Sequence, residues 1–291
     1  MEHHLAQVKP QASLNKMSAL KPIEGEVNLD KILARGGEMD KLIVEQIPKE
    51  LINDPIEWEK QYRAILKNYM DQNHGAGSTI LEADVYHLNG KTVTPAESSV
   101  AFEQQTKLNT AVNLLPDHWI KQANSYQKDG KARRLNILLQ KPKRESFRGD
   151  LHAINASTET VYSTFLHEFI HGMQRVRPDI DKIVQELHIR RTSNKKGGRQ
   201  ALRRIYENKA EETGRKDKYT DPYFGKQYKN AVYNGDGGAR EVFTMSFQHV
   251  LRGEDRPFEG QPNDWLHRLK TQQGGHGQEI INLVLGLLTG M

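Results

Sequence analysis

The segment from Val161 to Met173 constrains this chain more than any other. Its apolar residues recur every three or four positions, which predicts an amphipathic α-helix with one buried side. His167 and His171 lie four residues apart in it, so they project about 40° apart on the same helical face. That face is roughly opposite the centre of the apolar stripe. The helix is therefore expected to bury one side and to present both imidazoles to a cleft.

Residues 167–171 read His-Glu-Phe-Ile-His, a pattern with a direct chemical meaning. Two imidazoles one helical turn apart can bind a single metal ion, and Glu168 is placed to reach a metal-bound water. The alternative is a pair of surface histidines on a charged helix. The apolar face on the other side of the same helix favours the metal site over surface histidines.

The sequence contains no cysteine, which excludes disulfides, thiolate nucleophiles, iron–sulfur clusters and zinc fingers. A metal ion must then be held by His, Asp or Glu, and a catalytic zinc site usually has three protein ligands. Glu241 is the best third candidate, because it lies in the first turn of an apolar helix expected over residues 240–251. The alternative interpretation of Glu241 is an ordinary acidic residue, which a helix N-terminus favours. Weaker candidates are Glu211, Glu212 and His276.

A hydrolytic metal site also benefits from a hydrogen-bond donor for the oxyanion of a tetrahedral intermediate. Three tyrosines precede Glu241, namely Tyr223, Tyr228 and Tyr233. Any of them could take this role, and any could simply be packed in the core. Tyr228 and Tyr233 are the favoured pair.

The rest of the chain predicts an α+β protein that is mainly helical, with a small sheet packed beside the helix of His167. Residues 1–45 contain Pro and Gly with little periodicity and are expected to form a tail or loosely docked arm, followed by one domain over 46–291. Strands are expected at 135–140 and 150–155, and a hairpin over 79–94 turning at Asn89-Gly90. Further helices are expected at 48–70, 101–115, 159–175, 180–191, 200–212 and 278–288. Asp54-Pro55 is a helix start signal, Ser157 or Thr158 is a candidate cap, and Pro178 is expected to end a helix.

Charge and hydropathy narrow the classes of partner. The net charge of +5 is a mild basic excess, and only 36% of the residues are hydrophobic. Nucleic-acid binding is not inferred from this balance, and the basic run over residues 190–204 is expected to be solvated. No stretch approaches the roughly 20 apolar residues of a membrane span, and no secretory signal is visible.

The His-Glu-x-x-His helix followed by a helical Glu resembles the zincin metallopeptidases of the gluzincin branch. The resemblance implies Zn²⁺ bound by His167, His171 and Glu241, with Glu168 as general base in peptide-bond hydrolysis. It also implies a protein or peptide substrate laid along an edge strand before the active helix, for which 150–155 is the candidate. The metzincin branch is excluded, because its required Gly and His positions hold Gln174 and Arg177.

A closer resemblance, over roughly the last 180 residues, is to zincin-like domains of phage structural and head-morphogenesis proteins. It rests on 115–119, the active helix, 221–228, 240–245 and 285–290. It implies a cytoplasmic or virion-associated protein with virion proteins as partners. Ile170 departs from the family, since many members carry Gly there. Two alternatives stay open: a virion protein whose metal site is vestigial or stabilising, and a translocated effector or toxin protease.

Overall fold

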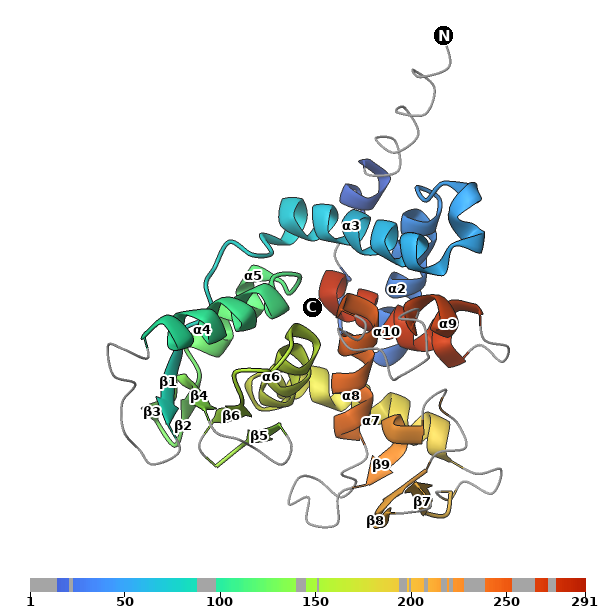
Figure 1. Cartoon of the computed structure of the whole chain (residues 1–291). Helices are drawn as coiled ribbons and strands as arrows, with labels where there is room; N and C mark the ends of the chain where they lie inside the picture. The colour runs from blue at the N-terminus through green and yellow to red at the C-terminus, as the bar shows by residue number, and fades with distance from the viewer. Residues whose placement is uncertain are drawn as a thin grey trace.

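The computed structural model describes residues 15–20, 23–87, 98–139, 145–150, 152–193, 198, 200–206, 209–215, 219, 222–227, 239–252, 265–271 and 276–291. The longer helices are α2 (Leu29–Val44), α3 (Pro55–His74), α4 (Ser98–Val112), α5 (Asp117–Asn124), α6 (Tyr162–Val176), α7 (Pro178–Thr192), α8 (Ala239–Phe247), α9 (Trp265–Thr271) and α10 (His276–Gly290). Shorter turns are η1 (Lys49–Asn53), η4 (Pro222–Gly225) and the π-helical η5 (Gln248–Arg252). The strands are β1 (Ala83–His87), β2 (Gln127–Lys128), β3 (Lys131–Ala132), β4 (Leu135–Leu139), β5 (Ser146–Arg148), β6 (Ala153–Ala156), β7 (Arg203–Tyr206), β8 (Lys209–Gly214) and β9 (Lys226–Gln227). The α+β class, mainly helical with small sheets, is confirmed (Figure 1).

The sheet beside α6 has the strand order β1-β4-β6-β5. β1, β4 and β6 run parallel, whereas β5 pairs with β6 in the antiparallel direction, with Phe147 opposite Ile154. All four residues of β6 are buried, as expected for a strand covered on both faces. The expectation that 150–155 forms an edge strand is therefore wrong. The antiparallel strand β5 occupies that edge, because its residues pair with β6 on the side away from β4.

In two other segments, pairing with strands elsewhere in the fold gives a structure that differs from the local prediction. Residues 200–212, expected to be helical, contain the antiparallel strands β7 and β8. This stretch has helix-forming residues but no broad apolar stripe, so cross-strand pairing determines its structure. In the expected hairpin over 79–94, β1 pairs in parallel with β4, while the turn at Asn89-Gly90 lies outside the described residues.

The helix boundaries follow the local signals only in part. Asp54 caps α3 as expected, since its side chain accepts a hydrogen bond from the Glu57 backbone N–H at 3.1 Å. α6 begins later than expected, with Val161 at its N-cap and no side-chain cap. Pro178 starts α7 rather than only ending α6, because proline is well tolerated in the first turn of a helix.

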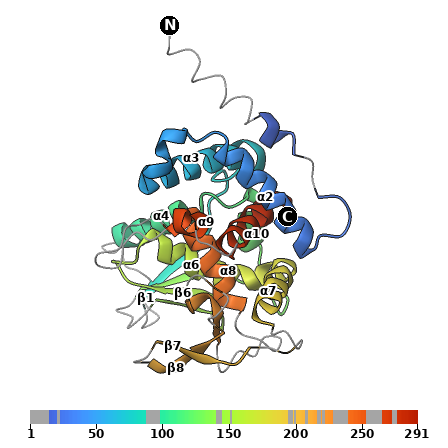
Figure 2. The same ribbon diagram turned by 90° about the vertical axis from the view of Figure 1, so that its right-hand side faces the viewer.

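The expectation of a tail or loosely docked arm is wrong for residues 29–44. These residues form α2, which packs along α10, and both views show the two helices side by side (Figures 1 and 2). A Cβ added at Gly36 of α2 would lie 1.7 Å from the Asn282 carbonyl oxygen of α10. One added at Gly286 of α10 would lie 2.0 Å from the Ile32 carbonyl oxygen. The two backbones are therefore in direct contact, and α2 belongs to the core.

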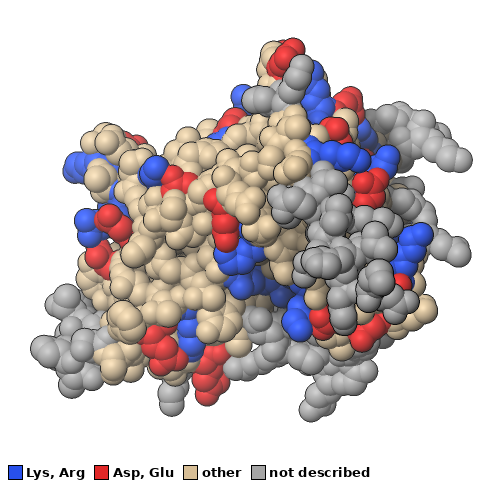
Figure 3. All heavy atoms as spheres, turned by 90° about the horizontal axis from the view of Figure 1, so that it is seen from above, with Lys and Arg blue, Asp and Glu red and all other residues tan. Residues whose placement is uncertain are grey.

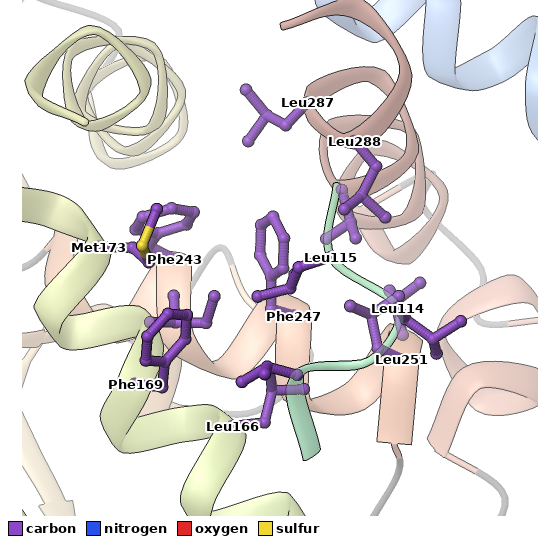
Figure 4. Packing of buried hydrophobic residues seen from close by; sticks show 14 of the residues in the cluster. Leu114, Leu115, Leu166, Phe169, Met173, Phe243, Phe247, Leu251, Leu287 and Leu288 are labelled. Atoms are coloured by element: carbon purple, nitrogen blue, oxygen red, sulfur yellow. The ribbon is translucent and has the colours of Figure 1, made fainter. Parts of the chain in front are cut away.

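The core that positions α6 lies between α6, α8 and α10. Leu166, Phe169 and Met173 of α6 pack towards the aromatic residues of α8 (Figure 4). The rings of Phe243 and Phe247 meet edge to face at 5.1 Å. Ile170, where the phage proteins that the sequence resembles often carry Gly, is fully buried in this core.

Several charged side chains on the described surface form ion pairs. Lys60–Glu57 and Lys67–Asp71 form ion pairs along α3, and the face seen in Figure 3 carries both acidic and basic side chains. Arg190 pairs with Asp30 at 2.9 Å, so this member of the basic run is not an isolated cation. None of the helices in the described ranges combines the length and hydropathy needed to cross a bilayer.

Candidate metal centre

Helices α6 and α8 bring three potential metal ligands together. His167 and His171 come from one face of α6, and Glu241 comes from the first turn of α8. His167 Nε2 lies 3.3 Å from Glu241 Oε2, and His171 Nε2 lies 3.9 Å from Glu241 Oε1. One ligand atom from each residue falls within 4.8 Å of the others. These three residues could hold a metal ion.

The donor set and its spacing fit a tetrahedral ion. With bonds of about 2.0–2.1 Å, two ligand atoms of a tetrahedral site lie about 3.3 Å apart. The distance of 3.3 Å from His167 to Glu241 Oε2 matches this separation, whereas the distance of 3.9 Å from His171, which ends at Oε1, is longer. The imidazole rings stand nearly perpendicular, at 81°, with their centroids 4.9 Å apart. On a four-coordinate ion, three protein donors would leave one position for another ligand.

Burial makes this arrangement sensitive to charge. The side chain of Glu241 is 1% exposed, and those of His167 and His171 are 12% and 14% exposed. Thr244 Oγ1 donates to Glu241 Oε2 at 3.3 Å, one turn along α8. A buried carboxylate beside two imidazoles requires a positive partner, either a proton or a metal ion.

The pKa of His167 reflects these surroundings. Burial alone lowers the pKa, but the hydrogen bond and negative charge of Glu241, together with Glu168 and Gln248, outweigh burial, so the pKa is raised overall. A metal ligand must be a neutral imidazole, so a metal ion and a proton would compete for this ring.

Glutamine side chains contact the outer ring nitrogens. Gln248 Oε1 lies 2.9 Å from His167 Nδ1, and Gln174 Oε1 lies 3.4 Å from His171 Nδ1. A proton on each Nδ1 leaves the Nε2 lone pairs directed at the metal position. Gln248 was not predicted from the sequence, although its place seven residues after Glu241 puts both on one face of a continuous helix.

The other sequence-predicted site residues separate into three groups. Glu168 is buried on α6 and its negative charge acts on His167. Tyr228 and Tyr233 lie outside the described residues, as do the side chains of Glu211 and Glu212 in β8. Two candidates have other partners: the Tyr223 hydroxyl accepts from Lys226 Nζ at 3.0 Å, and the His276 carbonyl accepts from Arg191 at 3.3 Å.

His249, next to Gln248, is a second histidine close to the site. Its ring is fully buried, 4.6 Å from Trp265 and 5.5 Å from Phe224, and within the described residues neither ring nitrogen has a hydrogen-bond partner. Burial lowers its pKa to about 3, with further lowering by the positive charges of His167, Arg63 and Arg268. The folded protein therefore keeps this ring neutral.

We expect His249 to make the fold sensitive to acid. Its folded pKa lies below its ordinary value, so the unfolded chain binds a proton first as pH falls from about 6.5 towards 3, and stability is lost over that window. At pH 5 the loss relative to pH 7 is about 2 kcal/mol. Urea unfolding of the wild type and of His249→Phe at both pH values should show the wild type losing about 2 kcal/mol more. Parallel pH dependences in the two proteins would contradict this.

Comparison with known proteins identifies no relative. No family model matches the chain, and neither a curated protein nor a solved structure matches it significantly.

Proposed function

We propose that this chain is a zinc-dependent peptidase of the zincin type. The observation that carries the proposal is the cluster of His167, His171 and Glu241 from two helices, whose ligand atoms lie within 4.8 Å of one another. All three donors are nitrogen or oxygen, a set that zinc commonly takes in hydrolytic sites. The pattern that predicted the cluster, His-Glu-x-x-His, has its Glu on the same helix.

Each residue then has a role that follows from its position. The two imidazoles and the Glu241 carboxylate would hold a zinc ion, and the buried setting would keep bulk water from screening it. Such an ion would supply Lewis-acid chemistry, polarising a carbonyl and lowering the pKa of a water to about 7. Glu168, beside His167, takes the proton of the attacking water and delivers it to the leaving amine.

The edge strand β5 suggests where the substrate lies. Among the described strands it pairs on one side only, with β6, so its other side can pair with an extended peptide. β5 also packs on α6: a Cβ at Gly172 would lie 3.0 Å from the Phe147 ring. Arg175, one turn beyond His171, donates to the Gly149 carbonyl just after β5. These contacts place β5 beside the metal-binding helix, which supports a protein or peptide substrate.

Metal analysis combined with a peptidase assay tests the proposal. Purified wild type is expected to contain about one zinc ion per chain. His171→Ala and Glu241→Ala should each lose most of it, because two remaining ligands hold zinc weakly. His276→Ala is the matched control, since this histidine lies outside the cluster, and it should keep its zinc.

Hydrolysis of an unfolded protein substrate should stop with a chelator and return when zinc is added back. A wild type that holds zinc tightly but cleaves none of a broad peptide mixture would contradict the proposal. That result would favour a stabilising metal site in a structural protein, such as a phage virion component.

A further inference from the structure

The two histidines of the metal site share an unusual outer contact. In each, Nδ1 faces a neutral carboxamide oxygen, from Gln248 at 2.9 Å and from Gln174 at 3.4 Å. Metal-binding histidines often donate this proton to a carboxylate, which makes the imidazole a stronger base. The difference between amide and carboxylate is one full negative charge next to each ligand.

The orientation of the Gln174 carboxamide is determined by the hydrogen bond that its nitrogen donates. Its Nε2 donates to Asp181 Oδ1 at 2.9 Å, which turns Oε1 towards His171. Asp181 also accepts from Gln185 through Oδ2 at 2.6 Å. The carboxamide of Gln174 therefore stands between the imidazole and the nearest carboxylate of this network. The amide of Gln174 contacts His171, and the carboxylate of Asp181 contacts only the far end of that amide.

Gln248 is held by the backbone of the π-helical turn η5, of which it is the first residue. Arg63 of α3 donates to the carbonyls of His249 and Val250 at 3.1 and 3.2 Å, and it also pairs with the buried Glu59 at 2.7 Å. Arg252, the last residue of the turn, donates to the Ala111 carbonyl of α4 at 3.1 Å. Interruptions of this kind in an α-helix often occur at functional sites. Here the turn is anchored from two other helices, so the Gln248 side chain starts from a fixed backbone.

We propose that Gln248 is a positioning residue for the metal site, and that its neutral amide directs His167 Nε2 to the ion without adding negative charge. With Gln174 in the same role at His171, neither Nδ1 contact adds a negative charge to that of the ligand Glu241. The inference rests on the proposed function. A divalent ion held this way keeps a net positive charge for polarising a substrate, at the cost of weaker binding than a carboxylate outer shell provides.

Two variants at position 248 separate positioning from mere packing. Gln248→Leu removes the acceptor at similar size, and zinc affinity measured by chelator competition should fall 10–100-fold. Gln248→Glu keeps an acceptor and adds a charge, so zinc should bind at least as tightly as in the wild type. The acidic limb of its pH–rate profile should move to higher pH. Gln72→Glu, on the exposed face of α3, makes the same change in net charge and should alter neither quantity.

The outcomes distinguish this inference from the proposed function. Unchanged zinc affinity in a folded Gln248→Leu, or equal weakening in the Leu and Glu variants, overturns the positioning role. Cleavage by the wild type would stand in either case. If the variants rank as expected but the wild type cleaves nothing, the outer-shell assignment holds and the peptidase proposal fails. A wild type that binds no zinc overturns both, and a Leu variant that does not fold leaves the Glu variant as the deciding measurement.

Discussion

Replacing Glu168 with Gln is expected to abolish peptide hydrolysis while leaving the zinc content unchanged. Glu168 lies next to His167 on α6, is buried, and exerts its charge on that histidine, but it is not part of the three-residue ligand cluster. Gln has the same size and cannot accept the proton of the attacking water. General acid–base groups contribute about 10²–10⁴-fold to rate, so kcat should fall by at least about a hundredfold.

A suitable control for Glu168→Gln is Glu103→Gln, which makes the same chemical change on the exposed side of α4. The Glu103 side chain is 57% exposed and pairs with Lys107, a contact that contributes little to stability. Its activity and zinc content should match the wild type. If Glu168→Gln retained more than about a tenth of the activity with full zinc, the role of general base would be wrong.

Replacing Gly36 with Ala is expected to destabilise the fold severely. The new Cβ would lie 1.7 Å from the Asn282 carbonyl oxygen and 2.7 Å from its Cα, both backbone atoms of α10. No rotamer change can relieve a clash with backbone, so α2 and α10 must move apart and lose packing along the buried face of α10. Overpacking of this kind costs about 3 kcal/mol or more, measurable by urea unfolding.

The adjacent glycine provides the matched control. A Cβ at Gly37 would meet the Asn282 side-chain nitrogen at 3.2 Å, and that side chain can shift. Alanine also favours a helix over glycine by about 1 kcal/mol. Gly37→Ala should therefore be neutral or slightly stabilising. Equal losses of stability in the two variants would show that α2 and α10 are not in backbone contact.

The candidate metal site was largely predictable because its signals are local. His167, Glu168 and His171 share one helix, and the spacing of the apolar residues around them indicates which face is buried. Glu241 was predictable as a helix residue at the margin of an apolar face. Its pairing with the histidines was a hypothesis until the packing of α8 on α6 placed its carboxylate 3.3 Å from His167.

Other features depend on contacts between segments far apart in the chain. The helix α2 has buried residues at helical spacing, among them Ile32, Met39 and Ile43, but its place in the core comes from its close fit to α10. The strands β7 and β8 form where helix propensity alone favours a helix. β5 becomes the sheet edge because it pairs with β6 from outside. No pattern within three or four residues encodes these pairings.

The sequence by itself determined the two candidate ligands on α6, because residue identity and helical spacing are properties of a few neighbouring residues. Tertiary structure decided that Glu241 joins them, which strand lies at the sheet edge near α6 and which amides contact the imidazoles. Gln248 is the clearest case: its side chain reaches His167 only because Arg63 and Arg252 anchor a π-helical turn from other helices. Such contacts arise from the packing of whole elements, and the residues that make them carry no distinctive local signal.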